Sequence, residues 1–400
     1  MTERAWDVIV VGARCAGSPL AMLLARKGYN VLLLDRATFP SDTISSHQVH
    51  QTGLARMKRW GLLDELMATG CPPFKAIRWE MEVGPIAGEL IPADGVDFST
   101  IPRRHVLDML LAGAATKAGA ELREGFGLTR LLFDGDRVVG VKGVAGDGRE
   151  VDERAALVVG ADGRNSTVGK LAGSARYRDD GTRAICYYTY VSGHDHPDAV
   201  IYTRRDWGVA VGPTHEGLCI LAMSLSKELL PGFKADIASG FWDRIRTIPE
   251  LADRMASARV EEPYKGLAEI PNFYRQSHGP GWALAGDAGY YRDPVTAQGI
   301  SDAFRDADEL FEAIDKGLSR REALDEALAG YQRERDATTA AGYDWTLVST
   351  SFAPDTETSR GFLGTVSGDP ELSRMFVNLN ATMTEFRTVF GLALERATAV

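Results

Sequence analysis

The sequence predicts an α/β protein that combines a parallel sheet and a three-stranded β-meander with a second, antiparallel sheet and a helical C-terminal region. Three observations predict this fold class. Apolar runs that read as buried strands are followed directly by glycine-bearing turns at three places along the chain. Short strand-like runs separated by turn residues occupy 128–152 and again 184–226. Residues 321–350 are rich in Ala, Glu and Arg, which favour helices.

The composition is that of an ordinary globular protein of 400 residues, with 44% apolar and 25% charged residues. The 45 basic and 55 acidic residues are mixed along the chain and give a net charge of −10, so nucleic acid is not an expected partner. No apolar run approaches the roughly 18 residues that span a bilayer, and no apolar leader precedes the first strand. The four cysteines show neither metal-type spacing nor a paired framework. We therefore expect a cytoplasmic protein with no metal site and no integral membrane association.

The first glycine turn has the order strand, turn, helix, strand, acid that a Rossmann-like dinucleotide-binding unit requires. It reads Gly12-Ala13-Arg14-Cys15-Ala16-Gly17. Gly12 permits the tight turn, and Gly17 lets the helix lie close to the sheet. Asp35, at the end of the second strand, is placed to accept from ribose hydroxyls, and Arg36 could cover the adenine or reach a phosphate. Arg14 replaces the middle glycine and could pair with a pyrophosphate instead. This turn alone does not separate NAD from FAD, nor from an unrelated doubly wound domain.

Two later turns complete a set of three. They read Gly160-Ala161-Asp162-Gly163 and Gly286-Asp287-Ala288. In this order and at these separations, the three turns resemble the FAD-binding fingerprints of the para-hydroxybenzoate hydroxylase-like flavoproteins. That group includes single-component aromatic and polyketide hydroxylases and the geranylgeranyl reductases. The resemblance implies noncovalent FAD, with Asp162 near the flavin pyrophosphate, although Asp162 could also be only the N-cap of the next helix.

The same resemblance implies the other cofactor contacts. Asp287 would contact the ribityl hydroxyls or the pyrophosphate, and the segment from Pro294 to Ile300 would pass the isoalloxazine ring. Gly299, at a helix start, would offer backbone N–H groups to the flavin, where a helix N-terminus favours negative charge. Arg104 would contact the flavin phosphates or ribityl chain. The full set of expected cofactor-binding residues is Gly12, Arg14, Cys15, Ala16, Gly17, Asp35, Arg36, Arg104, Asp162, Gly286, Asp287, Pro294, Gly299 and Ile300.

Between the turns, three strand-like runs at 128–133, 137–144 and 149–152 predict a β-meander. A meander before the second turn is typical of FAD-type rather than plain NAD-type domains. The segment 39–50 lies beside the flavin in relatives, which makes His47 the preferred catalytic candidate. Its imidazole could serve as a general acid near neutral pH, while a structural histidine bonded to the backbone remains equally consistent.

The runs between residues 184 and 226 predict an antiparallel sheet, which in this superfamily roofs the flavin and lines the substrate pocket. Tyr190, Tyr202 and Trp207 are candidates for substrate contacts, although aromatic residues on a sheet more often belong to a core. The helical tail could cover the pocket or build a dimer face, so a homo-oligomer is possible. The expected domains are a discontinuous FAD-binding domain (1–75, 98–175 and 277–312), a substrate-binding β-sheet domain (76–97 and 176–276) and a helical C-terminal region (313–400).

The function we expect is an FAD-dependent oxidoreductase that carries out NAD(P)H-driven monooxygenation of a hydrophobic aromatic or polyketide-like small molecule in secondary metabolism. One departure keeps an alternative open. Many aromatic hydroxylases read Gly-Asp-Ala-Ala-His at the third turn, whereas this chain continues with Gly289-Tyr290-Tyr291. A reductase of a carbon–carbon double bond, similar to the geranylgeranyl reductases, is therefore the alternative, and a noncatalytic flavin-binding protein is the alternative of another class. The Trp-x-Trp-x-Ile-Pro signature of flavin halogenases does not occur.

Overall fold

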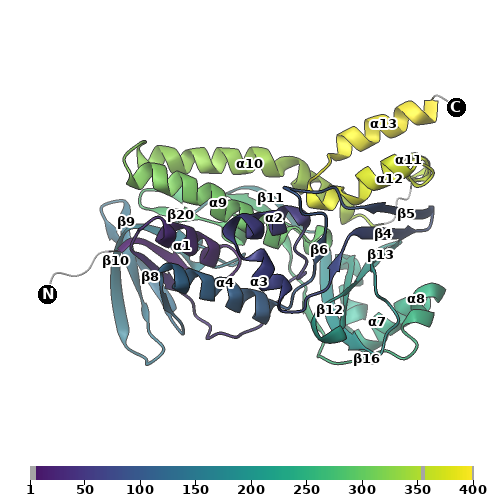
Figure 1. Ribbon diagram of the computed structural model, residues 1–400, viewed down its shortest axis with the longest axis horizontal. Helices are drawn as coiled ribbons and strands as arrows, with labels where there is room; N and C mark the ends of the chain where they lie inside the picture. The colour runs from purple at the N-terminus through teal and green to yellow at the C-terminus, as the bar shows by residue number, and fades with distance from the viewer. Residues whose placement is uncertain (1–5, 353–355, 399–400) are drawn as a thin grey trace.

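The computed structural model describes residues 6–352 and 356–398. Figure 1 shows a sheet region next to the N-terminus and a second sheet region at the other end of the molecule. The long helices α9 (Gly299–Leu318) and α10 (Leu324–Ser349) run along the first region, and α10 extends toward the C-terminal helices α11 to α13. These last three helices cover one face of the second region.

The first sheet has parallel apolar strands at its centre, in the order β19-β20-β10-β1-β2-β7. Helices α1, α4 and α9 pack on one face, and the meander covers the other. Because both faces are covered, β1 and β2 are almost wholly buried, which explains their continuous apolar sequences. The strands are β1 (Trp6–Val11), β2 (Val31–Leu34), β7 (Glu121–Arg123), β10 (Glu150–Gly160), β19 (His278–Gly279) and β20 (Trp282–Leu284).

The meander consists of β8 (Gly127–Asp134), β9 (Arg137–Val144) and the first half of β10. Residues 150–154 of β10 pair antiparallel with β9, and residues 155–160 pair parallel with β1. The sequence predicted a short meander strand and a separate buried strand here. They form one strand of 11 residues that passes from the meander into the parallel sheet.

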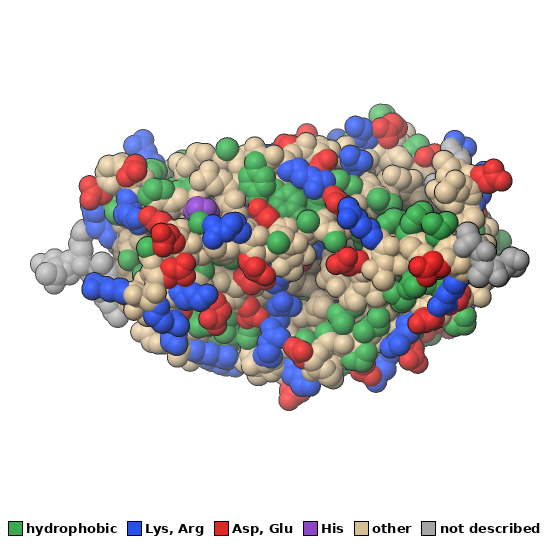
Figure 2. All heavy atoms as spheres, turned by 90° about the horizontal axis from the view of Figure 1, so that it is seen from above, with side chains coloured by type: hydrophobic (Ala, Val, Ile, Leu, Met, Phe, Trp, Pro, Cys, Tyr) green, Lys and Arg blue, Asp and Glu red, His purple; other side chains and the backbone are tan. Residues whose placement is uncertain are grey.

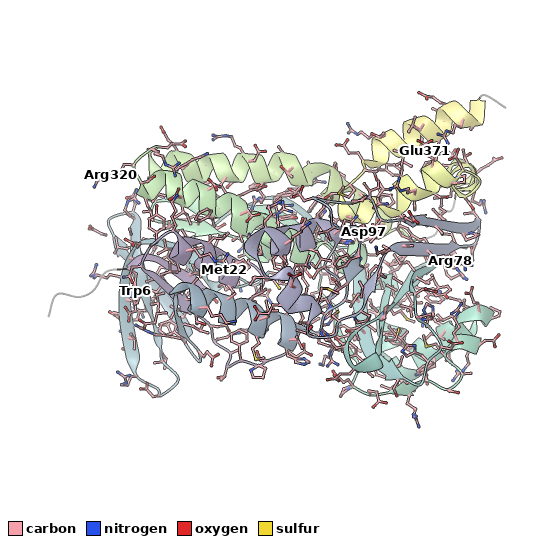
Figure 3. All side chains as sticks on the ribbon, viewed as in Figure 1. Trp6, Met22, Arg78, Asp97, Arg320 and Glu371 are labelled. Atoms are coloured by element: carbon pink, nitrogen blue, oxygen red, sulfur yellow. The ribbon has the colours of Figure 1, made fainter. Side chains whose placement is uncertain are left out.

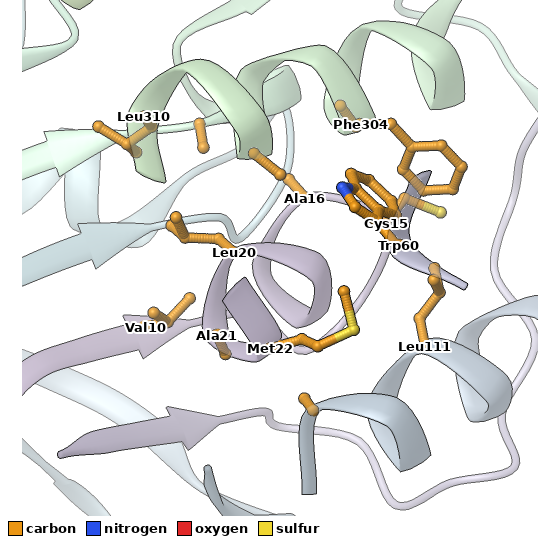
Figure 4. Close-up of a cluster of buried hydrophobic side chains, with 14 of the residues drawn as sticks. Val10, Cys15, Ala16, Leu20, Ala21, Met22, Trp60, Leu111, Phe304 and Leu310 are labelled. Carbon is orange, nitrogen blue, oxygen red and sulfur yellow. The ribbon is translucent and has the colours of Figure 1, made fainter. Parts of the chain in front are cut away.

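Helix α1 (Gly17–Arg26) lies at the centre of the main core, between α4 (Arg104–Ala118) and α9. Figure 4 shows Met22 of α1 on the side of Leu111 of α4, and Leu20 of α1 on the side of Leu310 of α9. The small residues Ala16 and Ala21 let α1 approach its neighbours closely.

The second sheet has the order β16-β12-β15-β14-β13-β4-β5, with β17 paired to β12. All its pairs are antiparallel except β13 with β4. Helices α6 to α8 pack on one face, and the end of α10 with α11 to α13 packs on the other. The strands are β4 (Ala76–Met81), β5 (Gly84–Glu89), β12 (Ala184–Ser192), β13 (Ala199–Arg204), β14 (Trp207–Pro213), β15 (Cys219–Ser226), β16 (Arg259–Val260) and β17 (Lys265–Leu267).

A third, three-stranded sheet has the order β11-β18-β21, and β3 pairs with β6. Within the described residues, no helix is both long and apolar enough to cross a membrane. Figure 2 shows acidic and basic side chains interspersed over the face seen from above. The remaining elements are α2 (Gln51–Trp60), α3 (Leu63–Met67), α5 (Thr167–Leu171), α6 (Leu230–Ala235), α7 (Ile237–Arg246), α8 (Pro249–Arg254), α11 (Glu357–Ser367), α12 (Pro370–Val377), α13 (Phe386–Thr398), β3 (Pro73–Phe74), β6 (Ser99–Thr100), β11 (Arg176–Thr182), β18 (Pro271–Arg275) and β21 (Tyr290–Tyr291).

Candidate functional site

A first cavity of about 800 Å³ lies at the carboxyl ends of the central parallel strands. Its wall contains Val11 at the end of β1, Leu34 at the end of β2 and Ala161 directly after β10. In an open α/β sheet, ligands bind at this edge, in the crevice where the strand order reverses.

Two helices begin at the wall of this cavity. Arg14, Cys15 and Ala16, just before α1, line it, and so do Gly299 and Ile300 at the start of α9. The first N–H groups of a helix have no partner within the helix and carry partial positive charge. The two helix starts therefore offer hydrogen-bond donors to an anionic ligand.

Glycine is required where these turns meet. Gly12 has a φ of +107°, and a Cβ added to Gly17 would lie 1.8 Å from the Gly12 carbonyl oxygen. A Cβ added to Gly286 would lie 3.0 Å from Cβ of Ala16. The first and third glycine turns therefore pack so closely that a side chain at Gly17 or Gly286 would collide with, or crowd, its neighbours.

Asp35 ends β2 at the cavity wall and is held by two backbone groups. Its Oδ2 accepts from the N–H of Ala13 at 2.7 Å, and its Oδ1 accepts from the N–H of Ala37 at 2.8 Å. Arg36 beside it is exposed and also lines the cavity. The carboxylate is thus fixed between the first turn and the end of the second strand.

Asp108 on α4 anchors two of the arginines that the sequence assigned to phosphate contacts, Arg14 and Arg104. Its Oδ2 accepts from Nη1 of Arg14 at 2.5 Å, and its Oδ1 accepts from Nη2 of Arg104 at 2.9 Å and from the Cys15 thiol at 3.4 Å. Arg14 also donates to the Ser41 hydroxyl at 2.7 Å. One fully buried carboxylate therefore fixes two cations at the cavity wall, and Arg14 is not free to turn fully toward a ligand.

Asp162 lines the cavity and also holds the start of α5. Its carboxylate accepts from the Ser166 hydroxyl at 2.5 Å and from the N–H groups of Thr167 at 2.6 Å and Val168 at 3.1 Å. Ser166 itself is the N-cap residue and accepts from the Gly169 N–H. Asp162 therefore both stabilises the start of α5, as the sequence allowed, and lies in the wall of the first cavity.

The third turn brings further ionisable groups to the cavity. Burial raises the pKa of Asp287 to about 7, against the attraction of Arg104. Asp302 on α9 accepts from Arg292, Tyr290 and Arg305. Burial alone would raise the pKa of Asp302, but the two arginines lower it to about 2. This carboxylate therefore stays ionised between its cations.

His47 does not have the character expected of a general acid near neutral pH. It is fully buried, has a φ of 62°, and its Nε2 lies 2.9 Å from the Tyr190 hydroxyl. Burial, reinforced by Arg104, lowers the pKa of His47 to about 3. The imidazole is therefore neutral under ordinary conditions, which corrects the expectation that it titrates near neutrality. His50 is also held structurally, with Nε2 at 3.1 Å from the Thr296 carbonyl oxygen.

A second cavity of about 370 Å³ lies between the second sheet and the C-terminal helices. Its wall on the sheet side includes Trp79 of β4 and Ile201 of β13, and its wall on the helix side includes Trp345, Phe376 and Phe386. Ser46, Cys186 and Pro294 line both cavities, so the two spaces adjoin.

The three aromatic substrate candidates line neither cavity. Tyr202 and Trp207 belong to the core under α6 to α8, on the opposite face of the sheet. Side chains alternate along a strand, so Ile201 and Thr203, the neighbours of Tyr202, line the second cavity instead. Tyr190 is buried beneath the guanidinium of Arg103, which lies 4.0 Å from its ring centre, so none of the three residues reaches the wall of either cavity.

All predicted cofactor residues except Gly17 line the first cavity, and Gly17 packs behind it. Sequence reasoning did not single out Arg164, Tyr188 or Arg292 as wall residues. Arg164 follows the second glycine turn directly and Arg292 follows the unusual Tyr290-Tyr291 pair, so position beside a motif was the available signal. For Tyr188, the only signal was that it lies two residues after Cys186 on a predicted strand, so that both side chains point to the same face.

The residues of the first cavity fit FAD. The close glycine packing and the two helix starts suit a diphosphate, as do the cations Arg14, Arg104 and Arg164 in the wall. Asp35 and Asp287 are acceptors for the hydroxyl groups of a ribose or ribityl chain. Across residues 6–352 and 356–398, no group of three or more His, Cys, Asp or Glu side chains could hold a metal ion.

Comparison with known proteins finds an FAD-binding family model and FAD-dependent enzymes as relatives. A family model described as an FAD binding domain matches residues 5–346. Digeranylgeranylglycerophospholipid reductase of Methanosarcina acetivorans is 26% identical over 357 residues, covering 86% of this chain and 83% of that protein. 6-Methylpretetramide 4-monooxygenase of Streptomyces rimosus is 29% identical over 328 residues, covering 79% of this chain and 77% of that protein.

Among solved structures, the flavin-dependent brominase Bmp2 superposes with a TM-score of 0.84 at 18% sequence identity, covering 99% of this chain and all of that one. At this identity the likeness concerns the fold. The matching proteins include a reductase, a monooxygenase and a brominase, so the fold does not separate these activities.

Proposed function

Since the chain belongs to the FAD binding domain family and is an FAD-dependent oxidoreductase, we propose that it catalyses NAD(P)H-driven monooxygenation of a hydrophobic aromatic or polyketide-like small molecule, in secondary metabolism. The observation that carries the proposal is the pair of adjoining cavities. The first is rich in charged side chains and glycine turns, and the second is lined mainly by apolar and aromatic residues, with no charged side chain among its described lining residues. A charged cofactor and a hydrophobic substrate can therefore occupy neighbouring spaces that meet at Ser46, Cys186 and Pro294.

FAD, when bound in the first cavity, supplies the electron transfer and the oxygen activation. The chain supplies binding and exclusion of water. Asp35 and Asp287 would accept hydrogen bonds from hydroxyl groups of the cofactor, and the two arginines held by Asp108 would attract its phosphates. The walls of the second cavity, from Trp79 to Phe386, keep water away from the substrate and hold it beside the junction.

The relatives include both a reductase and a monooxygenase, so it is the size of the second cavity that favours oxygenation over reduction. A digeranylgeranylglycerophospholipid carries two long prenyl chains and a phosphate headgroup. A cavity of about 370 Å³ without a charged side chain among its described lining residues is a poor fit for that lipid. A compact ring system suits this space better, because pockets for drug-sized ligands start at roughly 300 Å³.

One observation favours reduction of a carbon–carbon double bond as a second candidate. Such a reaction needs a proton donor beside the substrate, and the Cys186 thiol lies where the two cavities meet. Burial raises the pKa of Cys186 to about 12, so the thiol keeps its proton.

The first experiment is to record the visible spectrum of the purified protein before and after heating, and to identify the released flavin by chromatography. NADH and NADPH oxidation is then followed with a panel of polycyclic phenols, in air and without oxygen. We expect released FAD and a product that takes up ¹⁸O from labelled oxygen. A reduced product formed without oxygen would replace monooxygenation by the reductase candidate.

A variant pair tests the placement of the cofactor. Asp287→Ala should lose FAD, because the cavity loses an acceptor at the third turn. Asp97→Ala, which changes an exposed carboxylate paired with Lys75 (Figure 3), should retain FAD. Equal FAD content in the two variants would contradict the assignment of Asp287.

A further inference from the structure

The second cavity differs from the first in its charge. Among the described residues that line it, none is Asp, Glu, Lys, Arg or His. The first cavity, by contrast, is lined by Arg14, Asp35, Arg36, Asp42, Arg104, Asp162, Arg164, Asp287, Arg292 and Asp302. The part of a ligand that extends from the junction into the second cavity therefore lies against none of these charged side chains.

The polar atoms of the aromatic walls are already bonded within the protein. Nε1 of Trp79 donates to the Thr203 hydroxyl at 2.7 Å, and Nε1 of Trp345 donates to Oδ1 of Asn380 at 2.8 Å. Both acceptors also line the cavity. A bound anion would find these two indole donors occupied, and breaking either bond would leave a buried polar atom without a partner.

The aromatic rings form a connected wall that spans both sides of the cavity. The Trp79 ring lies 5.2 Å from the Phe376 ring and 6.3 Å from the Trp345 ring. The Phe386 ring stacks on Trp345 at 5.2 Å with an angle of 23°. Planar aromatic ligands gain offset or edge contacts with such rings beyond what burial alone supplies.

We propose that this cavity selects an uncharged, planar aromatic ring system as substrate and rejects the same rings when they carry a carboxylate or phosphate. The proposal rests on the function proposed above and names the class of its substrate. Phenolic hydroxyls, with ordinary pKa values near 10, stay neutral at physiological pH, so polycyclic phenols belong to the accepted class. A carboxylate would lose its hydration without gaining a cation in return.

The test uses isothermal titration calorimetry on the FAD-loaded protein at pH 7 with three probes. These are 9-phenanthrol, phenanthrene-9-carboxylate and farnesol, which represent a neutral ring system, its charged counterpart and a neutral open chain. We expect 9-phenanthrol to bind and the carboxylate to bind at least about 100-fold more weakly, because an unpaired buried charge is strongly disfavoured. Farnesol should bind more weakly than the phenol. Equal binding of phenol and carboxylate would overturn the selection against charge, and tighter binding of farnesol would overturn the selection for aromatic rings.

A designed cation provides a second measurement. Ser349 on α10 lines the cavity and is partly exposed, so Ser349→Arg can place a guanidinium at its edge with access to water. We expect this variant to bind the carboxylate at least about tenfold more tightly than the unaltered protein does. Ala341→Arg, at an exposed position of the same helix outside the cavity wall, should leave both affinities unchanged. Binding is read without turnover, so 9-phenanthrol that binds without any oxygenated product would contradict the proposed function but not this inference.

Discussion

The packing of α1 against the first turn gives a prediction that can be worked out from distances. In Gly17→Ala, the new Cβ would lie 1.8 Å from the Gly12 carbonyl oxygen, whereas real Cβ contacts stay above 3.0 Å. The start of α1 must therefore move by about 1.2 Å, the difference between these distances. The obstacle is a backbone atom of a turn with a φ of +107°, so no side chain can swing aside to relieve it.

This displacement has two consequences of different size. The core around α1 is closely packed, so forcing the helix outward should lower the free energy of unfolding by about 1–3 kcal/mol. A ligand hydrogen bond from this helix start would lengthen from about 2.9 Å to about 4 Å and be lost. A hydrogen bond to a charged group contributes about 1.5–3 kcal/mol, so each lost bond should weaken FAD binding at least about tenfold.

The assay measures FAD content after purification, the dissociation constant for added FAD, and the thermal midpoint of the apoprotein. Gly113→Ala is the matched control, since Gly113 lies within α4 and an added Cβ there meets nothing within 4 Å. That control should bind FAD normally and gain up to about 1 kcal/mol of stability. Normal FAD affinity and an unchanged midpoint in Gly17→Ala would refute the packing argument.

Three other predictions concern buried polar groups. Asp108→Asn should cost about 3–5 kcal/mol of stability and weaken FAD binding, because two cations lose their shared carboxylate, while Asp97→Asn at the surface should change the free energy of unfolding by less than about 0.5 kcal/mol; urea unfolding separates the two. His47→Ala should lower stability by about 1–3 kcal/mol by leaving the Tyr190 hydroxyl unpartnered, but should keep the pH profile of kcat/KM between pH 5 and 9, since the pKa of His47 is already lowered to about 3; a shifted profile would restore it as an acid–base group. Burial raises the pKa of Asp293 from 3.8 to about 7, so its protonated form stabilises the fold at low pH and that contribution is lost as the pH rises from about 4 to about 7; Asp293→Asn should therefore flatten the fall in thermal midpoint of the apoprotein between pH 4 and 7, and an unaltered slope would contradict this assignment.

The first cavity could be predicted from sequence because its chemistry is local. Each glycine turn follows directly on a buried strand, and the parallel topology brings all strand ends to one edge. Because Gly12, Gly160 and Gly286 each stand at or just after the end of a parallel strand, the three turns lie close together at that edge of the sheet. The parallel sheet and the meander followed from the same patterns, since burial on both faces produces continuous apolar runs.

The second cavity could not be predicted in this way, because its walls come from distant parts of the chain. Trp79 and Trp345 contact each other across more than half of the sequence. The alternation along β13 showed that Ile201 and Tyr202 face opposite sides, but not which side faces helices α6 to α8. Both faces of this sheet are covered by helices, so aromatic residues occur on both, and hydrophobicity alone cannot assign them.

The first cavity is built from local motifs and the second from distant segments, and this difference helps to explain why similar folds perform different reactions. The groups that suit FAD lie on strand ends and helix starts, which any protein with this topology can present at the same edge. The walls of the second cavity, where we propose that the substrate binds, lie instead on one face of the second sheet and on the C-terminal helices, where side chains can change without disturbing the strand ends. Strand β12 connects the two spaces through Cys186, which lines both, while its neighbour Tyr187 packs into the opposite core. Substrate choice in this chain should therefore respond to substitutions around Trp79, Thr203 and Trp345 while FAD affinity stays constant, because none of these three residues lines the first cavity.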